Sequence, residues 1–315
     1  VDCGMEKVVL EEILSIFPGE QREFWTGTLN QTRQLQEIRI RVGCPVQLLT
    51  DSEESFCTGS EEWTTQEALQ KILQHVCHYS LYAYEEELRQ GYVTIPGGHR
   101  IGMAGQVILR QDGTMGGFKK VQYFNIRIAR EKKGVARKLL PYIYKEGKPL
   151  NVLLVSPPAA GKTTMLRDLV RLISDGTSYG SGQKVGVVDE RSELAGCYLG
   201  IPQNDVGRRT DVLDGCPKAE GMMLLVRSMS PQLLAVDEIG TRSDAEALHA
   251  AFATGCKVFS TIHGETVEDV KRKLFLRDIL KEQWFDRFIF LERKETGFGI
   301  REILDGTFAP VEAGT

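Results

Sequence analysis

The fold is decided by residues 151–175, NVLLVSPPAAGKTTMLRDLVRLISD. The apolar run at 152–155 predicts a short strand, and apolar residues at helical spacing between 165 and 173 predict a helix with one buried face. The intervening residues, 156–164, contain Gly-Lys-Thr and are called the Gly-Lys-Thr loop below. Strand, tight loop and helix in this order are the context that a phosphate-binding P-loop requires.

In a P-loop, backbone N–H groups and the N-terminus of the helix surround the phosphates of a nucleotide. We expect Lys162 to reach the β- and γ-phosphates and the Thr163 hydroxyl to bind Mg²⁺. The loop residues expected to contact the nucleotide are Ser156, Pro157, Pro158, Ala159, Ala160, Gly161, Lys162, Thr163 and Thr164.

The loop departs from the usual P-loop pattern. Ser156 stands where the first glycine is usual, and Ala159 and Ala160 stand where further glycines often occur. Because Gly161 is the only glycine in the loop, fewer of its positions can take a positive φ without strain. Taken alone, Gly-Lys-Thr after a strand also fits an ordinary helix start, so the rest of the chain must decide.

A second apolar strand, predicted at 233–236, is followed by the carboxylates of Asp237 and Glu238. Ligands bind at the carboxyl edge of a parallel sheet. There we expect Asp237 to hold Mg²⁺ through water and Glu238 to orient or deprotonate the attacking water. In isolation these residues also fit an acidic surface turn, but their place after the Gly-Lys-Thr loop in a βαβ pattern favours the metal site.

The predicted strand at 258–261 ends in Thr261 and is followed closely by His263. We expect Thr261 to donate a hydrogen bond toward a γ-phosphate or the lytic water. We expect His263 to report whether the phosphate is bound, although a histidine after a strand also fits a structural role.

Residues 187–193, VVDERSE, end another strand with crowded charges. Either these residues form a solvated turn, or Glu190 or Asp189 helps to place the metal or the water and Arg191 balances the charge or contacts a neighbour. In the long segment that follows, read as a functional loop with one helix at 217–229, Arg227 is the arginine expected to contact a γ-phosphate. Most surface arginines are only solvated, which is the alternative for Arg227.

The pattern of predicted elements divides the chain into two domains and a linker. Residues 1–135 read as a small α+β domain, which includes a helix opened by a capping box at Thr64–Glu67. Residues 136–149 read as a linker. Residues 150–315 alternate apolar strands with helices, which is typical of a parallel sheet covered on both faces.

The bulk composition sets limits on function. With 315 residues, 42% of them hydrophobic, the chain can form about two domains with real cores. The net charge of −4 gives no overall attraction to nucleic acid or anionic membranes, although a local basic patch can still exist. Seven scattered cysteines without a CxxC pair predict neither a disulfide framework nor a zinc site and favour the cytosol. No apolar run approaches the roughly 18 residues of a membrane span, so we expect a soluble chain.

Four motifs in fixed order resemble those of the type II and IV secretion ATPases. They are a Walker A loop at 156–163, an Asp box at 187–193, a Walker B strand at 233–238 and a His box at 260–264. The chain is also similar to the stage III sporulation protein AA family of endospore-forming bacteria. The stretches that carry this likeness are 189–193, 209–215, 236–240, Arg39-Ile40-Arg41 and 98–102.

The resemblance implies a RecA-like (ASCE) P-loop α/β core with a parallel sheet, preceded by a smaller α+β domain. It implies a cytoplasmic ATPase that uses ATP and Mg²⁺, works as a ring hexamer and energises a secretion-like channel between mother cell and forespore. Such a motor would be recruited to membrane-embedded components of the channel on the mother-cell side. Arginines from the first domain or a neighbouring subunit would complete each site, and the candidates are Arg100, Arg127, Arg130, Arg191 and Arg209.

Two other functions remain open at this point. The alanines in the loop suit a degenerate scaffold that binds nucleotide weakly or not at all. RecA-like cores also move DNA and RNA, but the acidic pI near 5.9 and the lack of a Lys/Arg-rich tail lead us to expect no nucleic-acid partner.

Overall fold

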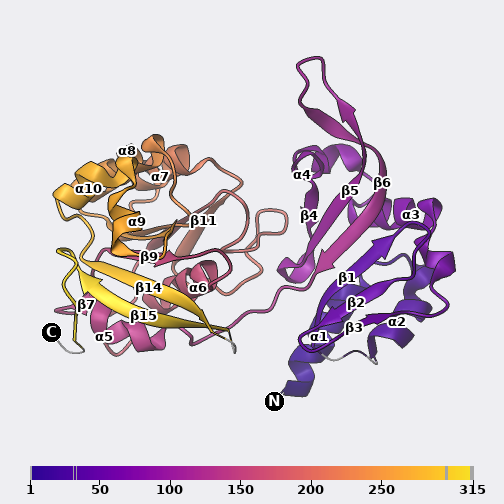
Figure 1. Ribbon diagram of the computed structural model, residues 1–315, viewed down its shortest axis with the longest axis horizontal. Coiled ribbons are helices and arrows are strands. Elements are labelled where there is room, and N and C mark those ends of the chain that lie inside the picture. The colour runs from indigo at the N-terminus through magenta and orange to yellow at the C-terminus, as the bar shows by residue number, and fades with distance from the viewer. Residues whose placement is uncertain (1, 31, 33, 295–296, 313–315) are drawn as a thin grey trace. The chain divides into compact units, whose positions relative to one another are not determined.

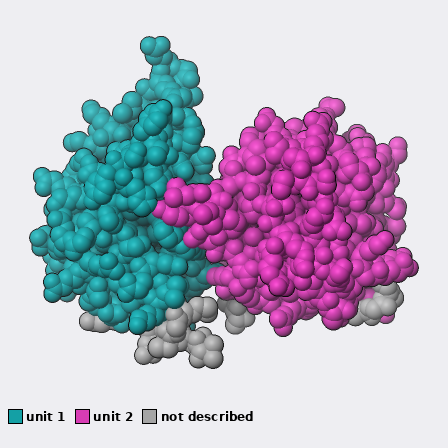
Figure 2. Space-filling model, turned by 180° about the vertical axis from the view of Figure 1, so that it is seen from behind, with its two compact units in different colours: residues 1–130 teal, residues 131–315 magenta. Residues whose placement is uncertain are grey.

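The computed structural model describes residues 2–30, 32, 34–294 and 297–312 (Figure 1). The chain divides into two compact units, Val1–Arg130 and Glu131–Thr315, which are coloured separately in Figure 2. Residues 136–149, expected as a linker, form short elements, and Ala136, Leu139 and Ile143 are fully buried in a core cluster of the second unit.

The first unit is an α+β structure whose helices and strands follow one another in the chain. They are α1 (Asp2–Leu14), α2 (Arg22–Asn30), β1 (Leu35–Arg41), β2 (Gln47–Thr50), β3 (Glu54–Phe56), α3 (Gln66–Val76), α4 (Glu85–Gln90), β4 (Tyr92–Thr94), β5 (Arg100–Leu109) and β6 (Met115–Arg127). The strands form one antiparallel sheet in the order β3-β2-β1-β6-β5-β4.

Side-chain alternation along β1 decides which face of this sheet is buried. Ile38 and Ile40 are fully buried and pack with Phe124 and Ile126 of β6 against the helices, whereas Arg39 lies on the other face. The expected helix is present as α3, but its N-cap is Thr65, which accepts from the Ala68 N–H. The prediction of a capping box that begins one residue earlier is therefore wrong.

The second unit contains the remaining elements. They are α5 (Leu140–Ile143), β7 (Tyr144–Lys145), β8 (Lys148–Pro149), β9 (Val152–Ser156), α6 (Lys162–Asp175), β10 (Val185–Asp189), β11 (Thr210–Asp214), α7 (Lys218–Ser228), β12 (Leu233–Val236), α8 (Arg242–Ala253), β13 (Lys257–His263), α9 (Val267–Lys271), α10 (Arg277–Lys281), β14 (Arg287–Lys294) and β15 (Gly297–Asp305). β11 lies inside the segment that the sequence predicts to be a loop with one helix, so that prediction is wrong for residues 210–214.

A seven-stranded sheet in the order β11-β10-β12-β13-β9-β14-β15 forms the centre of the second unit. Every neighbouring pair is parallel except β14 with β15. Along β9, Val152 and Leu154 point to one face and Leu153 and Val155 to the other. Buried residues therefore cover both faces, as expected for a parallel sheet.

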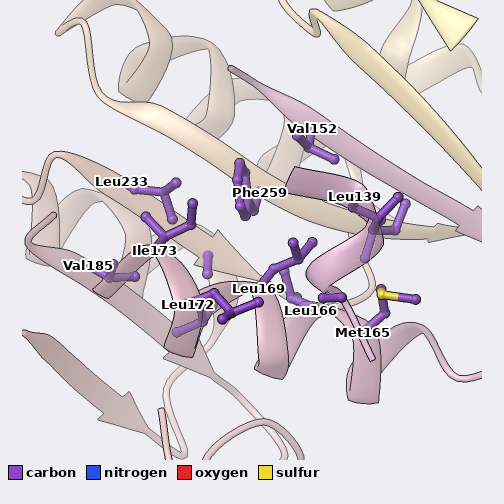
Figure 3. Packing of buried hydrophobic residues seen from close by; sticks show 14 of the residues in the cluster. Leu139, Val152, Met165, Leu166, Leu169, Leu172, Ile173, Val185, Leu233 and Phe259 are labelled. Atoms are coloured by element: carbon purple, nitrogen blue, oxygen red, sulfur yellow. The ribbon is translucent and has the colours of Figure 1, made fainter. Parts of the chain in front are cut away.

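Different helices cover the two faces of this sheet. Met165, Leu166, Leu169 and Ile173 of α6 fill one side, where Figure 3 shows them against Phe259 and Val152 of the strands. The buried residues of α7, α8 and α10 fill the other side. In the described part of the chain, no helix is long and apolar enough to cross a membrane.

Candidate functional site

Three neighbouring strands of the second unit end at the same edge of the sheet. β12, β13 and β9 lie side by side and run parallel, with Val236 opposite Ser260 and His263 opposite Ser156. The residues that follow these ends are therefore brought together, although they are far apart in the sequence. The Gly-Lys-Thr loop, Asp237 and His263 all lie at this edge.

The Gly-Lys-Thr loop contains two residues with left-handed backbone. Gly161, the N-cap of α6, has φ +79°, and Ala159 has φ +58°. A residue with a Cβ costs roughly 1–2 kcal/mol in this region. Ala159 therefore carries the strain that a glycine would avoid, and the loop still makes the turn that directs backbone N–H groups toward an anion.

Gly161 is also required for a steric reason that the sequence reading missed. A Cβ at this position would lie 2.3 Å from Cδ1 of Phe298, in β15. Phe298 itself packs against the core cluster that contains Met165. An aromatic side chain from a strand far along the chain therefore holds the start of α6 in place, and nothing in the local sequence indicates it.

Lys162 begins α6 and is only 5% exposed. Its Nζ donates to the carbonyl oxygens of Ser156 (3.3 Å) and Pro157 (3.2 Å) and to Nδ1 of His263 (3.0 Å). Burial lowers the pKa of the Lys162 ammonium from 10.5, and the negative charges of Glu238 and Asp237 oppose that shift. A buried ammonium is thus held among acceptors at the loop.

Asp237 joins the loop to β13 through two threonine hydroxyls. Thr163 Oγ1 donates to Asp237 Oδ2 at 2.6 Å, and Thr261 Oγ1 donates to Asp237 Oδ1. Thr261 is fully buried, and its Oγ1 also accepts from the Glu238 N–H at 2.8 Å. One buried hydroxyl therefore positions both acids that follow β12.

Glu238 and His263 complete the arrangement. Glu238 has φ +51°, a strained backbone that the bond to Thr261 helps to hold. His263 Nε2 lies 2.9 Å from Glu238 Oε1. Because Nδ1 accepts from the Lys162 ammonium, the geometry places the imidazole proton on Nε2, where it donates to Glu238. His263 thus connects Lys162 to Glu238.

The residues at this edge fit a nucleotide with Mg²⁺. Thr163 and Asp237 bring a hydroxyl and a carboxylate together at the N-terminus of α6, and Mg²⁺ prefers oxygen ligands and usually binds one or two protein groups plus phosphates. Within the described ranges, no cluster of three or more His, Cys, Asp or Glu side chains could hold a metal by itself. A metal here would therefore need oxygens from the nucleotide.

A hollow of about 430 Å³ opens beside the loop, a volume within the range of small-ligand pockets. Its lining residues are Pro157, Pro158, His263, Gly264, Glu265, Asp269, Arg272 and Lys273. Arg272 and Lys273 were not among the predicted site residues. They follow α9 and place two cations near His263. The only signal for them in the sequence is that two basic residues stand next to each other.

The acids at the carboxyl end of β10 have different contacts. Asp189 is 2% exposed and accepts from the backbone N–H groups of Glu193 (2.7 Å) and Ala195 (2.8 Å). Burial raises the pKa of Asp189, and these N–H groups oppose the shift. Glu190 pairs with Lys218 at the start of α7, and Arg191 is exposed. The expected placement of metal or water by Glu190 or Asp189 therefore gains no support from these contacts.

Arg167 is a buried residue that the sequence reading did not select. It lies in α6, and its guanidinium donates to the carbonyl oxygens of Leu194 and Glu193, both at 2.6 Å. Burial lowers the pKa of Arg167, and Glu131, Asp189, Asp237 and Glu193 oppose the shift. Arg167 thus ties the loop after β10 to the helix that begins at Lys162.

The structure does not bring Arg227 to this site within one chain. Arg227 is exposed in the last turn of α7, which leads into the amino end of β12, whereas Asp237 follows the carboxyl end of that strand. The length of β12 separates them, so these positions give no support within one chain to the expected γ-phosphate contact, which stays a prediction. Arg209 also lies at the amino edge, where it donates to the Ser174 carbonyl (3.0 Å).

The other predicted arginines belong to the first unit. Arg100 and Arg127 are directly opposite each other on β5 and β6, and the Arg100 guanidinium lies 4.6 Å from the centre of the Tyr92 ring. Arg130 donates to the Leu35 carbonyl at 3.0 Å. Their role in a neighbouring subunit stays a prediction.

Comparison with known proteins finds relatives that match almost the whole chain. The family model described as sporulation stage III, protein AA, matches residues 7–308. Stage III sporulation protein AA of Bacillus subtilis (strain 168) is 42% identical over 297 residues, which cover 94% of this chain and 95% of that protein. An uncharacterized protein, ycf45, of Porphyra purpurea is 28% identical over 132 residues, 41% of this chain and 22% of that protein.

Solved structures show the same fold at low sequence identity. The ATPase DotB of Legionella pneumophila is 15% identical, with a TM-score of 0.60 over 91% of this chain and 80% of that chain. The pilus retraction motor PilT, solved with bound ADP, is 16% identical. Its TM-score is 0.60 over 92% of this chain and 83% of that chain. These likenesses confirm the expected fold, a RecA-like α/β core with an N-terminal domain.

Proposed function

This chain belongs to the stage III sporulation protein AA family, and on that premise we propose that it is an Mg²⁺-dependent ATPase that drives a secretion-like channel in endospore formation. One observation supports the proposal most strongly. Lys162, Asp237 and His263 come from the ends of three different strands and meet around one loop. A chance acidic turn and a chance helix start would not share this set of contacts.

Each residue has a definite part in the proposed hydrolysis. Loop N–H groups and Lys162 bind the β- and γ-phosphates, and Thr163 and Asp237 hold the metal site. When bound, Mg²⁺ supplies positive charge that offsets the charge of the phosphates. Glu238 accepts a proton from the water that attacks the γ-phosphorus, as the bond to the β-phosphate oxygen breaks and ADP leaves.

His263 gives the proposal a way to couple binding to catalysis. Its imidazole contacts both Lys162 and Glu238. When Lys162 turns to a phosphate, His263 loses one of its two partners, and the orientation of Glu238 changes with it. We propose that His263 and Thr261 act in this way as sensors of the γ-phosphate.

The proposed motor works as a ring, because a site needs residues from a neighbouring chain to be complete. We propose a hexamer in which Arg100, Arg127, Arg130, Arg191 or Arg209 of a neighbouring subunit reaches the phosphates. DotB and PilT, named as an ATPase and a pilus retraction motor, share this fold. The proposed ring lies on the cytoplasmic, mother-cell side of the membrane and acts on membrane-embedded channel components.

Removing the ammonium of Lys162 tests the proposed activity. We expect Lys162→Ala to lower ATP turnover by about 100-fold or more, because a preorganised charge at the phosphates is lost. Phosphate release by the purified chain, residues 1–315, measures this turnover. Lys257→Ala is the matched control, since Lys257 begins β13 at the other edge of the sheet. A Lys162→Ala protein that hydrolyses ATP as fast as the parent would remove the assignment.

The strain at Ala159 favours a second candidate, a nucleotide-binding scaffold without turnover. A fluorescent ADP analogue and a phosphate-release assay separate the two. Binding without turnover in the parent supports the scaffold, whereas turnover that rises with protein concentration supports sites completed by a neighbour.

A further inference from the structure

β5 and β6 continue as a two-stranded ribbon beyond the sheet of the first unit. Their neighbours β4 and β1 pair with residues 100–102 and 123–127, whereas β5 and β6 pair with each other as far as Leu109 and Met115. Figure 1 shows the two strands running past the body of this unit, and the teal unit of Figure 2 narrows to the same projection. The part between Gly105 and Val121 is called the ribbon below.

Aliphatic side chains are exposed along the ribbon, increasingly toward its tip. Val107 is 42% exposed, Ile108 51% and Leu109 64%. Successive residues of a strand point to opposite faces, so three consecutive aliphatic residues make both faces of the ribbon apolar. On β6, the partly buried Met115 lies opposite Leu109, whereas Phe118, opposite Val107, packs against the core of the first unit. An exposed apolar patch of this kind marks a binding surface.

The ribbon strands are also basic, in a chain of net charge −4. Between Gly105 and Val121 the basic residues are Arg110, Lys119 and Lys120, and the single acid is Asp112. The Asp112 carboxylate accepts from the Thr114 N–H (2.9 Å) and hydroxyl (2.6 Å) at the turn. Lys119 and Lys120 are exposed next to the apolar residues.

We propose that the ribbon binds the surface of an anionic phospholipid bilayer. Aliphatic residues flanked by lysine and arginine match the boundary between acyl chains and charged headgroups. A partner protein with a flat surface would cover one face of the ribbon, whereas a bilayer surrounds both faces. Among the residues that the structure describes, no other strand pairs with the outer edges of the ribbon, so the ribbon lies at headgroup depth and does not enter the hydrocarbon core.

This inference extends the proposed function, because it gives the first unit a direct contact with lipid, independent of any membrane protein. It does not depend on ATP hydrolysis, since the ribbon and the Gly-Lys-Thr loop belong to different units. Failure of one proposal therefore leaves the other standing, and two separate measurements distinguish them.

The test is sedimentation of the full-length chain with vesicles of phosphatidylcholine, alone or with about one third phosphatidylglycerol. We expect binding to the anionic vesicles that weakens with added salt, and little binding to phosphatidylcholine alone. Each lysine near an anionic surface strengthens binding about fivefold, so Lys119→Gln with Lys120→Gln should weaken it roughly 25-fold. Ile108→Glu with Leu109→Glu should abolish binding that the assay can detect.

Leu199→Glu is the matched control, because Leu199 is 69% exposed in the second unit and should bind vesicles like the parent. All ribbon variants should keep the parent's thermal unfolding and ATP turnover, since these side chains lie outside the core. Two results would overturn the proposal: no binding of the parent to anionic vesicles, or unchanged binding by the Ile108→Glu, Leu109→Glu chain. If that chain binds vesicles normally but its sedimentation velocity shows weaker self-association, the ribbon is an interface between copies.

Discussion

Asp189-Glu190 and Asp237-Glu238 are the same dipeptide at the carboxyl end of the same kind of strand, yet they have different surroundings. Both aspartates are nearly buried, Asp189 at 2% and Asp237 at 9% exposure. Asp237 accepts from the hydroxyls of Thr163 and Thr261. Asp189 accepts from backbone N–H groups of its own following loop.

The order of the strands explains this difference. β12 lies beside β13, which in turn lies beside β9, so Asp237 faces residues from both the Gly-Lys-Thr loop and the end of β13. β10 lies on the far side of β12, next to β11. The chain after Asp189 turns back and supplies the carboxylate's partners locally. An Asp-Glu pair at a strand end thus indicates a site only when its neighbours are known.

Replacing each of the two glutamates by glutamine should give the largest difference in ATP turnover. We expect Glu238→Gln to lower ATP turnover by about 100-fold or more, because a general base is lost. Glu190→Gln breaks a partly exposed pair with Lys218 and should change turnover less than about fivefold. Steady-state phosphate release measures both, and equal losses in the two variants would show that the two glutamates do not differ in function.

Replacing each of the two aspartates by asparagine should affect different properties: the free energy of unfolding in one case and the Mg²⁺ dependence of turnover in the other. Asp189→Asn leaves one of two backbone N–H groups without an acceptor and should lower the free energy of unfolding by about 1–3 kcal/mol. Asp237→Asn keeps an acceptor for a threonine hydroxyl but weakens the metal site. It should raise the Mg²⁺ concentration for half-maximal turnover about tenfold or more. Urea unfolding and Mg²⁺ titration test this pair, and the reverse pattern would contradict it.

Alkaline titration should detect the lowered pKa of Lys162. Above this lowered pKa and up to the ordinary value of 10.5, the unfolded chain binds more protons than the folded chain. The free energy of unfolding of the parent, relative to Lys162→Met, should therefore rise with pH in this window. Glu238→Gln should start the rise at lower pH, because Glu238 opposes the shift, and Glu190→Gln should leave it unchanged.

Urea unfolding between neutral pH and about pH 10 gives this comparison, with each variant measured in the parent and Lys162→Met backgrounds. A difference that falls as pH rises would mean that burial does not lower the pKa of Lys162.

Relieving backbone strain with glycine should give the smallest effect, a change in the free energy of unfolding. Glu238 has φ +51°, so Glu238→Gly should raise the free energy of unfolding by about 0.5–1 kcal/mol while it abolishes turnover. Glu190→Gly gains no such relief and should lower stability by about 0.5–1 kcal/mol, through the flexibility of glycine and the lost pair with Lys218. Paired urea unfolding curves measure both, and a destabilised Glu238→Gly protein would show that the bond to Thr261 outweighs the strain.

Much of the fold could be predicted because its signals are local. The apolar runs at 152–155 and 233–236 became β9 and β12, and the helical spacing after Lys162 became α6. Local patterns fail where pairing partners are distant, and they do not predict β11, which pairs with β10. Thr65 rather than Thr64 caps α3, because the backbone of the preceding 3₁₀ turn, Glu61–Thr64, delays the helix by one residue.

The sequence by itself determined the strand–loop–helix unit, the parallel sheet and the residue types that a nucleotide site needs, because spacing and alternation act within one element. Only the tertiary structure decided which Asp-Glu pair lies beside the Gly-Lys-Thr loop, that His263 bridges Lys162 and Glu238, and that Phe298 covers Gly161. These contacts depend on the order in which strands pair. Pairing order is set by packing across the whole sheet and leaves no mark at any single residue.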